Sequence, residues 1–274
     1  MVLVDFEYDG EKLSDYGYFP CYINTSSNME IDIGSRLNFN SVKTKLTNTS
    51  RYLSSEYEEP NPTVFDICKR TNCELELPDE IDVRRLMKWL NKKGNKKFKP
   101  VYDNNDFVDV YFEGSFNISA IYVGGEIVGF TLTFTPNAPF GFGELETYSF
   151  SLTEENSTFT FIDSSDELGY SYPSKFEITC KDSGDLKIIN MSDDNYTTVI
   201  NNCVLGEKIT LNCRELIVDS NKSHEKLFND FNYNYPRFIN NFGNQTNIFT
   251  TSLPCNIEIK YSPIRKVGIF IWKS

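Results

Sequence analysis

The sequence has little of what catalysis and metal binding usually need. It contains a single histidine, His224, in 274 residues, so a two-histidine metal site is excluded and any catalytic triad would have to use this residue. His224 lies in the polar segment 219–225 (DSNKSHE), which favours a solvated loop histidine. Residues 141–143 (GFG) lack the third glycine and the following helix of a phosphate-binding loop, and are typical of a hinge.

The sequence also lacks long apolar runs and an excess of cations. Its apolar runs, such as residues 267–272, are far shorter than the roughly 20 residues that cross a bilayer. The N-terminal residues lack the basic and apolar regions of a signal peptide, so we expect folding in a cytoplasm and no membrane partner. A net charge of −12 and a pI near 4.7 argue against nucleic acid as a main partner, because phosphate binding needs clustered cations.

The cysteines form no CxxC pair and are odd in number, which predicts buried free thiols in place of a disulfide framework. Cys68 and Cys73 resemble half of a zinc site, but no second pair with ligand spacing accompanies them, so ordinary thiols are the favoured interpretation. The seven cysteines are Cys21, Cys68, Cys73, Cys180, Cys203, Cys213 and Cys255.

Residues 163–167 (DSSDE) gather three carboxylates. Such a group could hold a hard cation or supply the acid and base of a glycoside hydrolase. The segment lies between expected strands, where acidic turns are common, and this interpretation is favoured. We therefore expect no catalytic residues, no metal and no cofactor.

One segment, residues 78–91, carries a helical pattern. Val83, Leu86, Met87 and Leu90 recur at the spacing of one helical face, which predicts that they are core residues. Acidic residues fill the first turn and basic residues the end, as the helix dipole favours, and Gly94 is the expected C-terminal stop.

The rest of the sequence predicts a mainly β protein with two domains, residues 1–143 and 144–274. Residues 107–113, 116–123 and 126–134 are expected to form a meander, with Gly124-Gly125 as a hairpin turn. The second domain is expected to be an antiparallel sandwich. Its strands are expected at residues 147–152, 158–162, 175–180, 185–190, 197–201, 208–212, 215–219, 247–251 and 256–261.

Three segments do not fit a simple strand pattern. Residues 228–242 are crowded with asparagine and interrupted by proline, which predicts a long loop with one turn. Residues 24–51 are polar and are a candidate for a projecting or flexible arm. Residues 267–272 form a terminal strand, and the sequence leaves open whether it packs back on the first domain.

A basic cluster stands out in this acidic chain. Eight of its 27 cations fall within sixteen positions. Three interpretations stay open: contact with nucleic acid, contact with an acidic surface of a neighbouring subunit, or a solvated helix face. The residues of the cluster are Arg84, Arg85, Lys88, Lys92, Lys93, Lys96, Lys97 and Lys99.

Several segments, in order, resemble the distal tail protein family of bacteriophages. They are residues 6–10 (FEYDG) with 13–17 (LSDYG), 84–90 (RRLMKWL), 110–116 (VYFEGSF), and 129–141 (GFTLTFTPNAPFG) with its N-x-P turn. The resemblance covers most of residues 1–145 and continues more loosely to residues 262–268.

This resemblance implies an N-terminal β-barrel-like domain with one helix, which closes into a homohexameric ring, and a galectin-like β-sandwich as C-terminal domain. It implies a structural, non-catalytic protein that joins the tail tube to a baseplate. The implied partners are the tail tube protein, a tail-associated hub or lysin protein, and receptor-binding or tail fibre proteins, with nucleic acid at most passing through the ring. The implied location is the tail tip of a virion or of a tailocin-like particle.

A carbohydrate-binding module is the main alternative. Sandwich folds commonly stack sugars on exposed aromatic rings, and residues 231–236 (FNYNYP) supply such rings. A β protein rich in phenylalanine and tyrosine also needs those rings for its core, which is the favoured interpretation.

Overall fold

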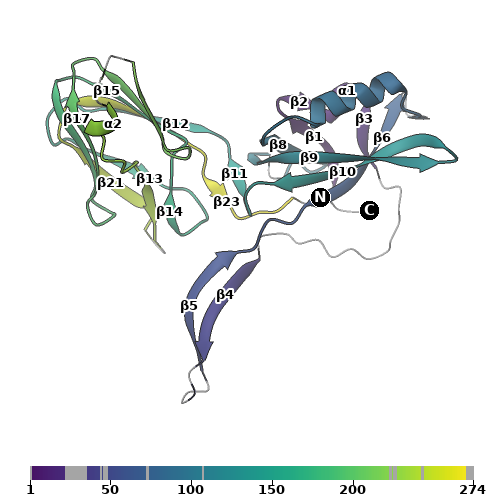
Figure 1. Cartoon of the computed structure of the whole chain (residues 1–274), viewed down its shortest axis with the longest axis horizontal. Coiled ribbons are helices and arrows are strands. Elements are labelled where there is room, and N and C mark those ends of the chain that lie inside the picture. Colours follow the sequence, from purple (N-terminus) through teal and green to yellow (C-terminus); the bar gives the residue numbers. More distant parts are fainter. Residues whose placement is uncertain are drawn as a thin grey trace. The chain divides into compact units, whose positions relative to one another are not determined.

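The computed structural model describes residues 2–21, 36–43, 45, 49–71, 74–106, 108–221, 224, 227–241 and 244–269. The described chain is mainly β, as the sequence predicts (Figure 1). It divides into two compact units. The first, the N-terminal unit, contains residues 1–142 and the segment from Arg265 onward, and the second, the C-terminal unit, spans Gly143–Ile264.

The N-terminal unit is built on an antiparallel sheet in the order β2-β1-β8-β9-β10-β6-β3. This sheet forms a half-barrel: β2 and β3 stand at the two ends of the strand order, and β3 also lies close to β1. β7 pairs with the end of β6, and β11 pairs with β9 and β23. A 3-10 helix, Leu13–Tyr16, follows β2. The strands are β1 Leu3–Tyr8, β2 Glu11–Lys12, β3 Tyr18–Cys21, β6 Thr63–Thr71, β7 Glu74–Glu76, β8 Lys96–Tyr102, β9 Val110–Val123, β10 Glu126–Pro136, β11 Gly141–Gly143 and β23 Ile264–Arg265.

The expected meander is one long hairpin. Residues 110–123 form a single strand, β9, where the sequence predicted two, and Phe107 lies outside the described residues. Gly114 does not end the strand, because its lack of a side chain lets β10 approach. A Cβ at this position would lie 2.3 Å from the backbone oxygen of Thr135. The predicted turn is confirmed at Gly124 and Gly125, whose φ angles of +62° and +92° suit glycine.

Helix α1, Glu80–Leu90, confirms the predicted helix. The Asp79 side chain caps its start by accepting a hydrogen bond from the Asp82 backbone N–H. The Asp82 side chain in turn accepts one from the Asp79 backbone N–H, which completes a capping box. The helix ends at Leu90, before the expected stop at Gly94, because the chain leaves helical geometry at Asn91.

One of the four residues predicted for the buried face of α1 is exposed, and a residue that was not predicted is buried. Leu86 and Leu90 are buried as predicted and Val83 is partly buried, but Met87 is 38% exposed and Trp89 is buried in its place. Met87 and Trp89 lie about 200° apart around the helix, at the two edges of the face centred on Leu86 and Leu90. The spacing of apolar residues alone does not decide which of these edges is buried. Trp89 is the buried one because its ring packs between the helix and β1.

Trp89 joins the helix to the sheet in two ways. Its indole Nε1 donates a 2.9 Å hydrogen bond to the backbone oxygen of Tyr8. Its ring stacks against Tyr16, with centroids 4.4 Å apart, and against Phe6 at 5.6 Å. A buried tryptophan therefore satisfies its polar atom while it contributes a large apolar area.

The C-terminal unit is a sandwich of two antiparallel sheets. One sheet has the order β12-β22-β15-β18-β19 and the other β13-β21-β16-β17. A single core contains apolar residues from both sheets, among them Phe161, Phe176 and Phe249. The strands are β12 Glu146–Ser151, β13 Thr158–Ile162, β15 Lys175–Cys180, β16 Gly184–Asn190, β17 Tyr196–Cys203, β18 Lys208–Asn212, β19 Ile217–Ser220, β21 Thr246–Thr251 and β22 Cys255–Tyr261.

All nine strands expected in this unit are present, within a few residues of their predicted ends. The sequence missed a small two-stranded sheet formed by β14, Gly169–Ser171, and β20, Phe238–Asn240. The expected loop at residues 228–242 does contain one helical turn, α2, Leu227–Asp230. Its second half forms β20, whose three residues are too few for a strand pattern to be recognised.

The cysteines are only partly as expected. Cys180, Cys203, Cys213 and Cys255 are free and buried, which confirms the prediction for these four. Cys21 and Cys68 form a disulfide, so the prediction of free thiols is wrong for them. β3 and β6 are neighbours in the sheet, which brings together residues that are 47 positions apart in sequence. Cys73 lies outside the described residues.

Candidate assembly surfaces

The basic cluster does not act as one patch, because several of its members have local partners. The Nζ of Lys92 lies 2.7 Å from a carboxylate oxygen of Asp9 and 3.6 Å from Glu11. The hydrogen bond to Asp9 raises the pKa of Lys92. The Arg85 guanidinium lies over the ring of Tyr16 at 5.6 Å. Two cations of the cluster thus already contact side chains of their own unit.

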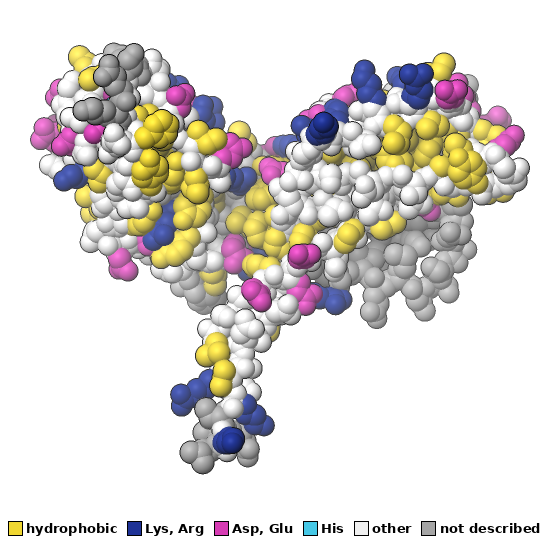
Figure 2. All heavy atoms as spheres, viewed as in Figure 1, with side chains coloured by type: hydrophobic (Ala, Val, Ile, Leu, Met, Phe, Trp, Pro, Cys, Tyr) yellow, Lys and Arg dark blue, Asp and Glu magenta, His cyan; other side chains and the backbone are white. Residues whose placement is uncertain are grey.

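The other members of the cluster divide between α1 and β8. Lys97 lies over the ring of Tyr111, with Nζ 4.1 Å from the centroid, while Lys96 and Lys99 are half-buried on β8. Arg84, Lys88 and Lys93 are exposed on α1 and just after it. Figure 2 shows Lys and Arg side chains gathered over α1. The exposed basic face of the N-terminal unit is therefore smaller than the sequence suggests.

A β-hairpin carries the second candidate surface. β4, Leu37–Lys43, pairs with β5, Ser50–Tyr57, and the two strands form a sheet of their own (Figure 1). We call this hairpin the arm. Every residue of β4 is exposed, and so is every residue of β5 before Tyr57. The described residues of segment 24–51 thus form part of an exposed arm, which continues to Tyr57, while residues 24–35 lie outside the described residues.

The arm exposes large apolar side chains that a solvated hairpin does not need. Phe39 is 67% exposed, Tyr52 62% and Leu53 61%. The rings of Phe39 and Tyr52 lie 6.3 Å apart, across the two strands. In the register of the hairpin, Lys43 pairs with Ser50 and Arg51 with Val42, and Figure 2 shows basic side chains at that end of the arm. An isolated two-stranded hairpin is only marginally stable in water, so this surface favours a partner.

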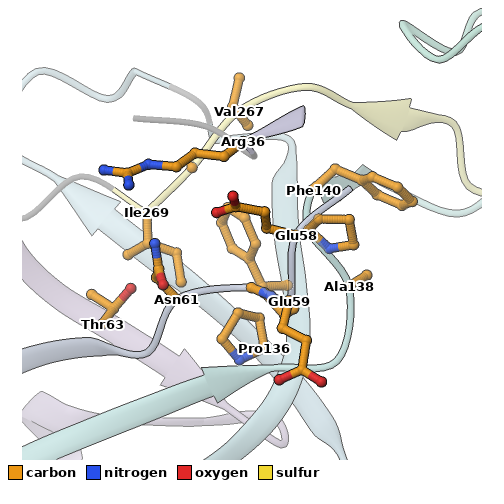
Figure 3. Close-up of a pocket in the computed structure, with 14 residues that line it drawn as sticks. Arg36, Glu58, Glu59, Asn61, Thr63, Pro136, Ala138, Phe140, Val267 and Ile269 are labelled. Carbon is orange, nitrogen blue, oxygen red and sulfur yellow. The ribbon is translucent and has the colours of Figure 1, made fainter. Parts of the chain in front are cut away.

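A shallow groove lies at the base of the arm (Figure 3). Its apolar lining includes Phe112, Pro136, Phe140 and Ile269, and Figure 3 shows Glu58 and Arg36 at its edge. Its free volume of about 60 Å³ is far below the ~300–1,000 Å³ of typical small-molecule sites. The groove therefore suits a side chain of another protein better than a substrate.

His224 is not the solvated loop residue that the sequence favoured. Its side chain is 6% exposed, and its ring nitrogens lie 2.8 Å from Glu207 and 3.1 Å from Asp230. Burial alone lowers the pKa of His224, but the hydrogen bonds to the two carboxylates outweigh it and raise the pKa above its usual value. The sequence could not show this, because Glu207 comes from the turn between β17 and β18. With both nitrogens engaged, the imidazole is a structural group.

In the acidic segment 163–167, the first residue, Asp163, also has a structural role. Asp163 is fully buried, and its carboxylate accepts hydrogen bonds from Ser165 N at 2.9 Å, Ser171 Oγ at 2.7 Å and the Tyr261 hydroxyl at 2.5 Å. Asp166 is exposed, so the three carboxylates do not converge. Among the described residues no group of three His, Cys, Asp or Glu side chains could hold a metal ion.

The aromatic segment 231–236 does not form an exposed platform. Phe231 is 3% exposed and Tyr235 5%, and both belong to the sandwich core, while Tyr233 is 58% exposed. The favoured interpretation of these rings as core residues is thus confirmed for two of the three. The described residues also contain no helix long and apolar enough to cross a membrane.

Comparison with known proteins gives the family. A model of a phage tail protein N-terminal domain matches residues 1–138, and a model of a phage tail C-terminal domain matches residues 140–261. No curated protein matches the chain.

Two solved structures share the fold over nearly the whole chain. One is the Dit protein of phage SPP1, described as a paradigm of the hub adsorption apparatus in phages that infect Gram-positive bacteria. It aligns with a TM-score of 0.61 at 11% identity, over 96% of this chain and 99% of its own. The other comes from the activated baseplate of phage P2 with Ca, with a TM-score of 0.52 at 10% identity, over 95% and 98%. The resemblance to distal tail proteins is confirmed, and the chain belongs to the family of phage tail proteins that these N- and C-terminal domains define.

Proposed function

We propose that this protein is the distal tail component of a phage tail tip, a structural protein that closes into a homohexameric ring. The observation that carries the proposal is the fold, which follows that of the SPP1 hub protein over both units and in the same order. The ring would join the tail tube to the baseplate, with the tail-associated hub or lysin protein and the receptor-binding or tail fibre proteins as partners. A galectin-like C-terminal unit is part of the same expectation.

In the part of the chain that the structure describes, the groups considered for catalysis do not converge, which agrees with a structural role. The single histidine is held between Glu207 and Asp230, and the fully buried Asp163 is held by three hydrogen bonds. We infer that these groups stabilise the C-terminal unit and take no part in a reaction. We propose that the protein is a scaffold in the tail of the virion or of a tailocin-like particle and that it assembles in the host cytoplasm.

The arm is the element best suited to join neighbouring copies. Its apolar rings are exposed, and no other strand in the described part of the chain pairs with either of its edges. The groove at its base includes apolar side chains in its lining. A contact in which the arm of one copy packs on a different surface of the next copy is heterologous. Such contacts close into rings when the rotation between copies permits it.

The mass of the purified protein in solution tests the ring directly. Light scattering across a concentration series is expected to show a species of six times 31.6 kDa, or a rise toward it with concentration. Negative-stain images of that species should show six-fold rings. A strict monomer at all concentrations, and also in the presence of the tail tube protein, would contradict the proposal.

A matched pair of substitutions tests the arm. Phe39→Asp is expected to shift the equilibrium toward monomer, because it places a charge in the apolar contact. Phe228→Asp is the control, since Phe228 is 66% exposed in the C-terminal unit, close to the 67% of Phe39. Equal effects of the two substitutions on the mass would exclude a specific role of the arm.

The exposed basic residues of α1 are proposed to face a neighbouring subunit or the lumen of the ring. Arg84, Lys88 and Lys93 are the members of the cluster to test, because Lys92 already pairs with Asp9. Their joint replacement by glutamate is expected to weaken ring formation or joining to the tail tube, most strongly at low salt. Unchanged assembly and unchanged joining would favour a solvated helix face.

A further inference from the structure

Three buried thiols converge in the core of the C-terminal unit. Cys180 lies at the end of β15, Cys203 at the end of β17 and Cys255 at the start of β22. Each of these residues is at most 2% exposed, and all three belong to the core that the two sheets share. Cys180 and Cys255 come from one sheet and Cys203 from the other, so the cluster spans the interface between the sheets.

Within its own sheet, Cys180 lies directly opposite Cys255. The backbone N–H of Cys180 donates to Glu207 at 2.9 Å, and that of Cys255 donates to Leu152 at 3.1 Å. The two cysteines therefore do not bond to each other through their backbones. In antiparallel sheets such non-hydrogen-bonded pairs bring their side chains closest together.

The thiol of Cys203 contacts that of Cys180 from the other sheet. The turn that follows Cys203 returns along β15, because the Cys180 backbone bonds to Gly206 at 2.8 Å and to Glu207 at 2.9 Å. The hydrogen bond between the two thiols, together with burial, raises the pKa of Cys203. The Cys203 Sγ also lies 3.3 Å from the backbone oxygen of Ile200, to which it donates.

Neighbouring thiols can bind a soft metal ion or form a disulfide. In the part of the chain that the structure describes, no three His, Cys, Asp or Glu side chains have an arrangement that could hold a metal ion. Thiols in contact across two sheets meet the first requirement for a disulfide, which is that both sulfur atoms can reach each other. Oxidation is therefore the chemistry that this cluster supports best.

We propose that Cys180 and Cys203 are the site of a further disulfide, which links the two sheets of the C-terminal unit under oxidising conditions. The oxidant is a small disulfide such as oxidised glutathione. The thiolate of one cysteine attacks it, forms a mixed disulfide and releases one glutathione thiol. The second cysteine then displaces the other glutathione. One S–S bond forms in the protein and one breaks in glutathione, whose two sulfur atoms take up the two electrons and two protons.

Burial determines when this reaction takes place. Thiols inside a folded core are shielded from reagents, so the exchange proceeds through transient opening of the unit. We therefore expect slow oxidation in native buffer and faster oxidation in denaturant below the unfolding midpoint. A cytoplasm keeps thiols reduced, so the link would form after a particle leaves the host. This timing rests on the proposed tail-tip role, whereas the disulfide itself does not.

The link is expected to stabilise the C-terminal unit. It closes a loop that contains β16 and β17, which restricts the unfolded chain. For a loop and a unit of this size, the melting temperature of the C-terminal transition should rise by about 10 °C. The transition of the N-terminal unit, which has its own core, should not change as a result of this link.

Peptide mapping of the full-length protein tests the site. The reduced protein is incubated with oxidised glutathione, with and without urea below the unfolding midpoint, and the remaining free thiols are blocked. We expect the peptide that contains Cys180 to be linked to the one that contains Cys203, and the pair to be lighter by two hydrogens than the sum of both. Trypsin separates the four cysteines of this unit into residues 176–181, 188–208, 209–214 and 238–260.

A matched pair of variants connects the link to stability. Cys203→Ala should abolish both the linked peptide and the rise in melting temperature on oxidation. Cys213→Ala is the control, because Cys213 is also 2% exposed in the same core, and it should keep both. The shift is measured between the oxidised and reduced forms of each variant, so the cost of the substitution itself cancels. If Cys203→Ala does not fold, the peptide map of the wild-type protein decides.

Three outcomes would overturn the proposal. The first is that Cys180 and Cys203 stay unlinked after oxidation, with or without urea. The second is that Cys180 is linked to Cys255, which would place the disulfide within one sheet. The third is that the Cys180–Cys203 link forms but leaves the C-terminal melting temperature unchanged or lower. The solution mass of the same samples reports ring formation, so failure of this proposal is distinguishable from failure of the proposed function.

Discussion

Replacing Glu207 by glutamine removes the main charged partner of the protein's single histidine. Glu207 has a side chain that is 1% exposed, and its carboxylate lies 2.8 Å from Nδ1 of His224. It also accepts hydrogen bonds from the Ser220 hydroxyl at 2.7 Å and the Val204 backbone at 2.9 Å. The substitution keeps the shape of the side chain and its oxygen but deletes the charge.

The expected cost follows from the burial of the pair. Removing one partner of a buried ion pair typically destabilises a protein by about 3–5 kcal/mol, because the remaining charge stays out of water without compensation. His224 keeps Asp230 at 3.1 Å, and glutamine can still accept one hydrogen bond. We therefore expect the lower end, about 3 kcal/mol for the unfolding of the C-terminal unit.

The pair also predicts how stability changes with pH. The folded pKa of His224 is raised above its usual 6.5, so its contribution is complete below about pH 6.5 and is lost as the pH rises through the folded pKa. The folded pKa of Glu207 is lowered from 4.5, because hydrogen bonds outweigh its burial, so its contribution is lost as the pH falls below about 4.5. The pair stabilises most between these two values.

Denaturant unfolding of the full-length protein, monitored by circular dichroism, measures this effect. Scanning calorimetry of the same samples gives the thermal transitions. The two units have separate cores, so we expect two transitions, and only that of the C-terminal unit should move. Because His224 is the sole histidine, the difference between wild type and Glu207→Gln from pH 6 to 8 reports this pair. That difference should shrink as the pH rises, by at most about 1.4 kcal/mol per pH unit.

The control is Glu258→Gln, since the side chain of Glu258 is 40% exposed and pairs with Lys260 at 3.4 Å. It should change stability by less than about 0.5 kcal/mol. A loss below about 0.5 kcal/mol in Glu207→Gln, or a difference from wild type that grows between pH 6 and 8, would refute the reasoning.

Three further predictions concern the N-terminal unit. Reduction of the Cys21–Cys68 disulfide, which spans 47 residues, should destabilise that unit by up to about 4 kcal/mol in chemical denaturation, while the C-terminal transition stays in place. Trp89→Phe should cost about 1–3 kcal/mol by the same assay, because it removes the buried indole N–H that donates to the backbone oxygen of Tyr8. Gly114→Ala should lower the melting temperature and cost about 1–3 kcal/mol or more, since its Cβ would lie 2.3 Å from a backbone oxygen of β10, and an unchanged melting temperature would contradict the close approach.

The sequence by itself determined the local structure of this protein. Short strand-like segments separated by turns predicted all nine longer strands of the C-terminal unit. The spacing of Leu86 and Leu90 with the acidic first turn predicted α1. The Gly124-Gly125 turn was predictable because few other residues adopt its positive φ angles. These features depend on neighbours within a few positions, which a sequence displays directly.

Only the tertiary structure decided which distant groups meet. It paired Cys21 with Cys68, placed His224 between Glu207 and Asp230, and buried Trp89 in place of Met87. The physical reason is that local periodicity fixes which face of an element is buried, while the partner of a side chain depends on which elements the fold brings together.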